Sequence, residues 1–229
     1  MARSHHPARW LGAAALALLL ALPGRRVAAQ APGNWALKLT PQHLVLSGLW
    51  LEAEHARPGH PAQSLLLGPQ LYAGPAGRPD IVYDPTQAAY YGNVRGAGLQ
   101  AQHRFYLGPS RAFPAGWYVG YGPQIQYFQL SFRRDGWREE PGPGGVPYLV
   151  FTGDTPFQER VLRYGVSVQA GRQWLLTRRL LLDVYAGLGL RQSHSWSTYG
   201  ASQYQSGPSD YAHRGVYVPA GFSLGVLLR

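Results

Sequence analysis

Cysteine is absent from the 229-residue chain, and lysine occurs only once, as Lys38. The absence of cysteine excludes disulfide bonds, thiolate metal ligands and a cysteine nucleophile. The other basic residues are arginines scattered along the chain, so we expect no contiguous basic surface and no nucleic-acid partner. Charged residues make up only 14% of the chain, which is unusual for a soluble protein.

A long hydrophobic segment is also lacking, because the one sustained apolar stretch, residues 10–22, is too short for a comfortable transmembrane helix. It follows Arg9 and is followed in turn by the small residues Val27, Ala28 and Ala29. This order is typical of a secretory signal peptide. We therefore expect residues 1–29 to be a signal peptide and residues 30–229 to form one exported domain. An uncleaved membrane anchor is the alternative.

The chain is rich in glycine, tyrosine and tryptophan, with 29, 15 and 7 residues. After residue 34, apolar and polar or small residues alternate along several segments, as in Leu180, Leu182 and Val184 against Asp183 and Tyr185. Such alternation predicts strands with two different faces. The eight segments are 35–40, 48–54, 64–73, 96–107, 117–127, 163–174, 180–196 and 216–228. The predicted fold is all-β, a closed antiparallel up-and-down transmembrane β-barrel of about eight strands.

The connections between these segments alternate in length. Short turns are expected near residues 56–63, 108–115 and 176–179, and long loops rich in Gly, Pro, Asp and Tyr near 75–92, 134–159 and 198–215. Transmembrane barrels have short turns on one side and long loops on the other. The first connection departs from this trend, because it is either very short, near Pro41–Leu44, or an irregular turn that reaches Gly48.

Alternation alone does not say which face points outward, since a soluble lipid-binding barrel has the same two faces reversed. Glycine, serine and glutamine dominate the polar face, which suits a narrow lumen better than a surface in water. Aromatic residues on the apolar face stand near the strand ends, where a membrane barrel carries its interfacial girdles. These membrane-interface aromatics are Trp35, Phe105, Trp117 and Trp174 at one end, and Tyr127, Tyr164 and Trp196 at the other.

Charged residues also occur on the polar face, and in a confined lumen opposite charges should pair. Glu52 and Glu54 share a face and form the expected acidic centre. A salt-bridged plug is favoured over a conducting pore, because eight strands leave little open space. The expected lumen charge network consists of Lys38, Glu52, Glu54, Arg104, Arg163, Asp183 and Arg191.

Four segments resemble the small outer-membrane β-barrel proteins of the OmpA/OmpX-like type and their uncharacterised relatives. They are residues 34–41 (NWALKLTP), 51–54 (LEAE), 184–190 (VYAGLGL) and 219–226 (PAGFSLGV). The resemblance spans nearly the whole exported domain. It implies a bacterial outer-membrane location, with membrane lipid and the barrel-assembly machinery as partners. The chain departs from such barrels at its end, where Leu227-Leu228-Arg229 stands instead of a final aromatic residue.

One run, Ser193-His194-Ser195 near the expected outer leaflet, carries residue types that a hydrolase could use. Barrel enzymes that remove acyl chains from lipopolysaccharide use a His and a Ser on one face, whereas alternation puts His194 outside and both serines inside. The histidines lack the spacing of a metal pair. We therefore expect no catalytic residue, no metal site and no cofactor.

The function expected from the sequence is a non-enzymatic structural or surface-interaction role in the bacterial outer membrane. Tyrosines in the expected outer loops, such as Tyr148, Tyr204 and Tyr211, suit contact with an unknown extracellular ligand. Two alternatives stay open: a lipid A-modifying, deacylase-like enzyme of the same membrane, and a soluble exported lipid-binding barrel.

Overall fold

A computed structural model describes residues 34–76, 92–198, 204–205 and 210–228, and the expected signal peptide lies outside them. Nearly all of the described chain is extended. The strands are β1 (Trp35–Leu39), β2 (Gly48–Ala56), β3 (Gln63–Ala76), β4 (Gly92–Ala112), β5 (Ala115–Pro141), β6 (Pro147–Leu175), β7 (Leu180–Ser197), β8 (Gly215–Tyr217) and β9 (Ala220–Leu228). Two short 3-10 helices, η1 (Pro41–Leu46) and η3 (Pro143–Gly145), interrupt them.

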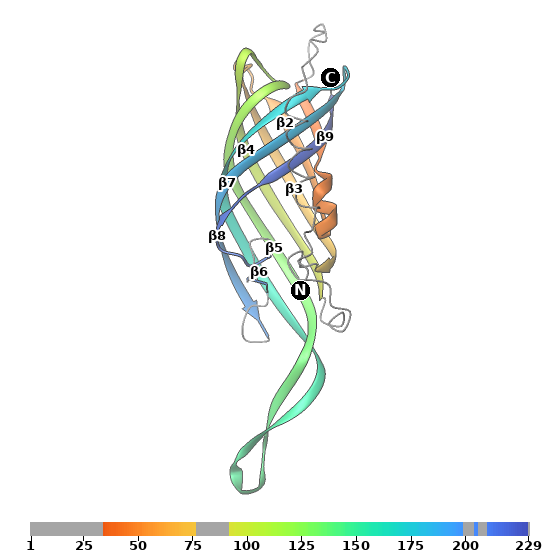
Figure 1. Ribbon diagram of the computed structural model, residues 1–229, viewed down its shortest axis with the longest axis vertical. Coiled ribbons are helices and arrows are strands. Elements are labelled where there is room, and N and C mark those ends of the chain that lie inside the picture. The colour runs from red at the N-terminus through yellow and green to blue at the C-terminus, as the bar shows by residue number, and fades with distance from the viewer. Residues whose placement is uncertain (1–33, 77–91, 199–203, 206–209, 229) are drawn as a thin grey trace, which may run out of the picture.

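The strands close into a ring in which every neighbour is antiparallel (Figure 1). Strands β1 to β7 follow in chain order, and β8 and β9 are two parts of one interrupted strand that pairs with β7. The ring closes where β1 pairs β9, from Trp35↔Leu228 to Leu39↔Leu224. The predicted eight-stranded, closed, antiparallel barrel is confirmed.

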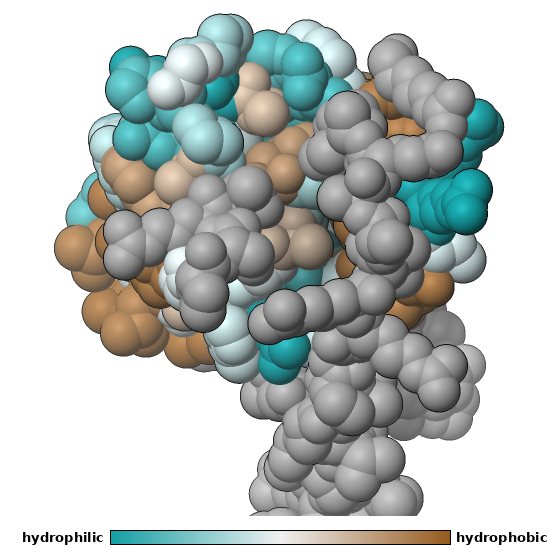
Figure 2. Space-filling model, turned by 90° about the horizontal axis from the view of Figure 1, so that it is seen from above, coloured by the Kyte–Doolittle hydropathy of each residue, from teal (hydrophilic) through white to brown (hydrophobic). Residues whose placement is uncertain are grey.

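The two faces of the strands point as the alternation predicted. Leucine and valine side chains stand exposed on the outside, and in the end view of Figure 2 hydrophobic residues lie along the visible flank. Along β3, for example, Leu65 and Leu67 are exposed whereas Ser64 and Leu66 are buried. No described helix has the length and hydrophobicity needed to cross a membrane.

Two ends of the barrel differ. The turn end holds the short connections β2–β3, β4–β5 and β6–β7, together with the start of β1 and the end of β9. The loop end holds the connections β3–β4 and β7–β8 and the extension of β5 and β6. The expected turns near 56–63, 108–115 and 176–179 all lie at the turn end.

One predicted loop is wrong. Residues 134–159 do not form a loop, because β5 and β6 stay paired as far as Pro141↔Pro147. Residues 132–158 thus form a hairpin arm that extends beyond the barrel wall (Figure 1). At the base of the arm Phe132 packs in the lumen cluster with Phe157 beside it, but residues 138–152 include no buried side chain, so no strict alternation marks the distal part of the arm.

The first connection takes the irregular form. Strand β1 has five residues and gives way to η1, whose end is marked by Ser47 with a positive φ of 56°. The Thr40 N–H donates to the Trp50 carbonyl, and this bond turns the chain back towards β2. As a result β1 is much shorter than its partners in the ring.

The lumen is less polar at its ends than the sequence predicted. At the loop end, Val94, Phe128, Leu130 and Val161 point inward and pack with Tyr204 and Tyr211. At the turn end, Tyr106, Tyr118 and Leu181 form a second cluster with residues that include Phe113 and Leu227. Glycine makes room for these rings: a Cβ on Gly171 would lie 2.5 Å from Cζ of Tyr118.

Candidate functional site: the barrel lumen

The structure brings five of the seven expected lumen charges together near the turn end. Lys38 Nζ lies 2.6 Å from Glu54 Oε2 and 2.9 Å from Asp183 Oδ2, and 3.7 Å from Glu52 Oε2. Arg104 Nη1 lies 2.7 Å from Asp183 Oδ2 and 3.2 Å from Glu54 Oε2. We call these five residues the charge network. All are at most 3% exposed, so each depends on the others to offset its lost hydration.

Neutral donors complete the charge network. Tyr106 Oη donates to Glu54, Tyr118 Oη donates to Asp183 at 2.8 Å, and Gln173 Nε2 donates to both carboxylates. The Arg104 guanidinium also lies over the Tyr118 ring, 4.3 Å from its centroid. Side chains from β1, β2, β4, β5, β6 and β7 therefore meet across the barrel and fill the lumen there.

The other two expected charges, Arg163 and Arg191, lie apart from the charge network. Arg163 donates from Nε to Gln126 Oε1 at 2.7 Å and from Nη1 to the Asp210 carbonyl at 3.3 Å. Arg191 stacks on the Tyr217 ring at 3.9 Å. Within the described part of the chain, neither arginine has a carboxylate oxygen within 4.0 Å.

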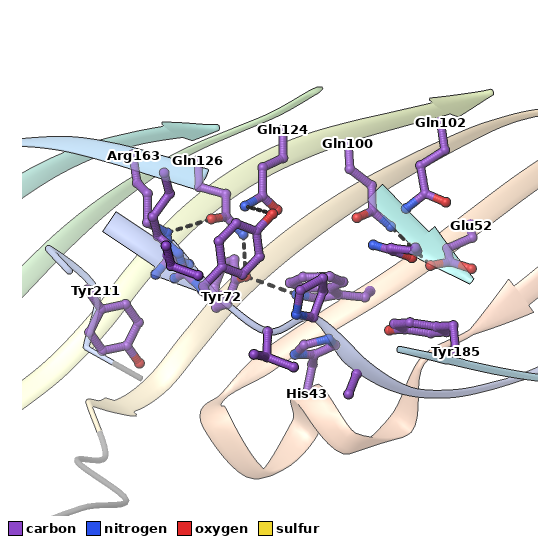
Figure 3. Close-up of a pocket in the computed structure, with 18 residues that line it drawn as sticks. His43, Glu52, Tyr72, Gln100, Gln102, Gln124, Gln126, Arg163, Tyr185 and Tyr211 are labelled. Carbon is purple, nitrogen blue, oxygen red and sulfur yellow. Dashed lines mark hydrogen bonds between the residues drawn. The ribbon is translucent and has the colours of Figure 1, made fainter. Parts of the chain in front are cut away.

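A cavity of about 490 Å³ lies beside these arginines, and Figure 3 shows its lining. Five glutamines and four tyrosines make up half of the lining residues, with Glu52 as the one carboxylate among them. Several are held by one another: Trp50 Nε1 donates to Tyr72 Oη, and Gln126 Nε2 donates to the same oxygen. Such a wall offers many hydrogen-bonding groups and broad aromatic faces.

A segment of the last long connection covers the cavity at the loop end. Ser193 Oγ donates to the Ala212 carbonyl at 2.6 Å, and Tyr204 and Tyr211 pack on Phe128 and Phe132. These two tyrosines are 4% and 7% exposed, so they are not free for contact outside. Burial raises the pKa of the Tyr211 hydroxyl, which therefore stays a protonated donor at neutral pH.

The candidate hydrolase residues point in different directions. His194 lies on the outer face with Nε2 3.4 Å from Tyr164 Oη, whereas Ser193 points inward to Ala212. No cluster of three His, Asp or Glu side chains able to hold a metal occurs within the described residues.

The expected interface aromatics divide into two groups. Trp35, Trp117, Tyr127, Tyr164 and Trp196 are exposed on the outer face. Phe105 is half-buried beside Tyr121, and Trp174 is only 8% exposed, with the Arg172 guanidinium 5.0 Å from its ring centroid.

Sequence reasoning missed the cavity and the residues that cover it. The lining of the cavity comes from nearly every strand and from η1, so no local sequence pattern indicates the cavity. In the register of the structure Arg163 stands opposite Ser193, and Arg191 opposite Gly165, so neither faces a carboxylate across the ladder, but this register cannot be read from the sequence.

No family model matches the chain, and no curated protein matches it. Among solved structures, the chain is similar to the crystal structure of Acinetobacter baumannii CarO, with a TM-score of 0.43 and 10% sequence identity. The match covers 86% of this chain and 98% of that chain. A likeness at this level assigns no function, and it does not show membership of the OmpA/OmpX-like family.

Proposed function

We propose that the chain is a non-enzymatic protein of the bacterial outer membrane, which spans the bilayer as a barrel and presents the hairpin arm to the outside. The observation that carries the proposal is the exposed apolar wall. Leu37, Leu67, Leu99, Val168 and Leu190 are each 42–60% exposed, and such an exterior is stable in hydrocarbon but not in water.

Closure of the ring supports the same proposal. Backbone groups in hydrocarbon need partners within the protein, and a closed antiparallel barrel supplies them around most of its circumference. In the usual orientation of such barrels the turn end faces the periplasm and the loop end faces the outside. The girdles of exposed aromatics, with Trp35 and Trp117 at one end and Trp196 at the other, fit the two headgroup zones.

The filled lumen favours a role other than free conduction. The charge network obstructs the turn end, and the aromatic cluster around Phe128 obstructs the loop end. Among the residues that the structure describes, the hairpin arm is the part that extends farthest towards the surroundings. Its tip exposes Val146, Tyr148, Leu149 and Phe151, each at least half-exposed, and aromatic and aliphatic side chains of this kind suit a binding surface.

Topology is tested on intact cells. An epitope tag inserted at Gly144, in the tip of the arm, should be labelled by antibody without permeabilisation. A matched tag at Arg178, in the β6–β7 turn, should be labelled only after permeabilisation. The protein should also stay in the membrane pellet and shift in gel mobility when boiled in SDS. Recovery in the soluble periplasmic fraction would refute the membrane barrel and favour a soluble lipid-binding barrel.

The interaction role is tested by replacing Val146, Tyr148, Leu149 and Phe151 together with serine. Cells carrying this variant should attach less to polystyrene and to one another than cells carrying the unaltered chain, at equal amounts of folded barrel. Unchanged attachment in both assays would remove the arm from the proposal.

A further inference from the structure

The wall of the barrel is interrupted beside residues 215–222. Strand β8 and the first residues of β9 pair with β7 on one side, while the β1–β9 ladder stops at Leu39↔Leu224. On the other side of residues 215–222 lie η1 and the start of β2, with no backbone hydrogen bond to them among the described residues. We call this interruption the seam.

The cavity extends to the seam. Its lining includes the lumen residues Gln126 and Arg163 and also Val216 and Val218, which are 61% and 66% exposed on the outer face. The cavity therefore reaches residues 216–220, where the described chain has a backbone-paired neighbour on the β7 side only. Helix η1 covers part of the seam, since His43 lines the cavity and stacks on Trp50 with ring centroids 3.5 Å apart.

The seam lies at the depth of the apolar wall. Val216 stands opposite Leu190, in the middle of β7 and well inside Trp196. Unpaired backbone at membrane depth is tolerated where it borders a cavity or is covered by protein. In the proposed orientation the seam therefore lies between the cavity and the hydrocarbon region.

The inner part of the cavity carries positive charge and hydrogen-bond donors, which suit an anion. Arg163 and Arg191 both line it without a carboxylate partner among the described residues. Arg191 Nε and Tyr211 Oη are buried and have no hydrogen-bond partner there. All of these groups are donors, and leaving buried donors unsatisfied costs free energy that an oxyanion would recover.

We propose that the lumen cavity binds a single-chain amphiphile with an anionic oxygen headgroup, which enters sideways from the membrane through the seam. The headgroup contacts Arg163, Arg191 and Tyr211, and the acyl chain leaves between Val216 and η1 towards lipid. Two sources share this chemistry, a free fatty acid and a single-chain phosphate monoester. The inference rests on the membrane location proposed above.

The test is calorimetric titration of the full chain in nanodiscs of zwitterionic lipid, with laurate, dodecyl phosphate and dodecanol as probes. Laurate, dodecyl phosphate or both should bind at least ten-fold more tightly than dodecanol, and their order tells which headgroup is preferred. Arg191→Gln should weaken binding of the preferred anion at least ten-fold. Arg172→Gln, which removes an arginine from the outer face, should change it less than two-fold.

Tyr211→Phe removes one oxygen and keeps the ring, so it tests the site even if an arginine variant fails to fold. It should weaken binding about three-fold or more. Equal affinity for dodecanol, or unchanged affinity in both Arg191→Gln and Tyr211→Phe, would overturn the proposal. Tighter binding of acetate or inorganic phosphate than of the amphiphiles would also overturn it, in favour of a site for water-soluble anions.

Failure here is distinguishable from failure of the proposed function. A heat-modifiable barrel in the membrane pellet that binds none of the amphiphiles refutes the lateral site alone. A protein recovered from the soluble periplasm refutes the membrane barrel, whatever it binds.

Discussion

Lys38 Nζ reaches Asp183 Oδ2 at 2.9 Å across the lumen, joining β1 to β7 between residues 145 positions apart in the chain. The same carboxylate oxygen accepts from Arg104 Nη1 of β4 at 2.7 Å. One acidic side chain thus ties together three strands that are not neighbours in the ring.

Asp183→Asn should destabilise the barrel strongly. The change removes one of the negative charges that face the buried Lys38 and Arg104. Breaking a buried ion pair in this way costs about 3–5 kcal/mol of folding free energy. The temperature at which the folded band disappears from SDS gels should fall. Glu140→Gln breaks the exposed Arg138–Glu140 pair and should cost less than about 1 kcal/mol; a comparable loss in both variants would contradict the role given to the charge network.

Gly171→Val should also destabilise the barrel, for a steric reason. A Cβ there meets the Tyr118 ring, and overpacking of this kind costs about 1–3 kcal/mol. The same gel assay measures it. Gly153→Val, at a glycine with open space around its Cβ position, is not a matched control because its φ of 67° itself disfavours valine. Ser64→Val is equally unsuitable, since Ser64 bonds Glu54.

Tyr118→Phe serves as a comparison for Gly171→Val. It keeps the ring but removes the hydrogen bond to Asp183, so in the Gly171→Val background it should destabilise the barrel further without relieving the clash. In a Tyr118→Ala background, which lacks the ring, Gly171→Val should cost less than it does in the unaltered chain. An equal cost in both backgrounds would place the clash elsewhere.

Leu67→Arg should destabilise the protein in lipid bilayers by about 2–4 kcal/mol, the cost of an arginine near the bilayer midplane on a barrel exterior. Leu67 is half-exposed in the first half of β3, and its side chain belongs to the exposed apolar wall. Urea unfolding in lipid vesicles measures the effect. Leu149→Arg, on the hairpin arm, should have almost no effect, and equal effects would argue against hydrocarbon around the barrel.

Replacing residues 137–151 with a short Gly-Ser turn should change the free energy of unfolding of the barrel by less than about 1 kcal/mol. In this part of the arm β5 and β6 pair with each other alone, so no barrel contact is lost. The gel-shift temperature checks this prediction. A marked fall would mean that the arm supports the wall.

His194→Ala should leave the acylation of lipid A unchanged in cells that overproduce the protein, because Ser193 points into the lumen and away from His194. Mass spectrometry of the extracted lipid gives the answer. An acyl chain lost or gained in a His194-dependent way would revive the deacylase-like alternative.

The barrel itself was predictable from the sequence because alternation is a local property of each strand. Lys38, Glu52 and Asp183 were assigned to the lumen by parity alone, and all three lie inside. Parity also placed Arg163 with them, but it does not report height along the barrel, and Arg163 lies beside the cavity instead.

Two features could not be predicted from the sequence, for different physical reasons. The distal part of the hairpin arm follows from pairing between residues such as Glu139 and Leu149, neither of which is buried, so its register carries no signal from a buried face. The cavity follows from the early end of β1, where Pro41 stops the ladder and η1 replaces it. Because η1 replaces the strand there, part of the lumen stays empty. The alternation of residues along a strand does not report empty space.

The five-residue length of β1 has a mechanical consequence. Strands β5 and β6 share a ladder from Gly116↔Gln173 to Pro141↔Pro147, whereas β1 holds β9 only from Trp35 to Leu39. A ring under tension parts at its shortest ladders, and those of β1 with β2 and with β9 hold five residue pairs each, so pulling on the chain from the N-terminal side should detach β1 first. The remaining strands would then open as one sheet, like a cylinder slit along its length.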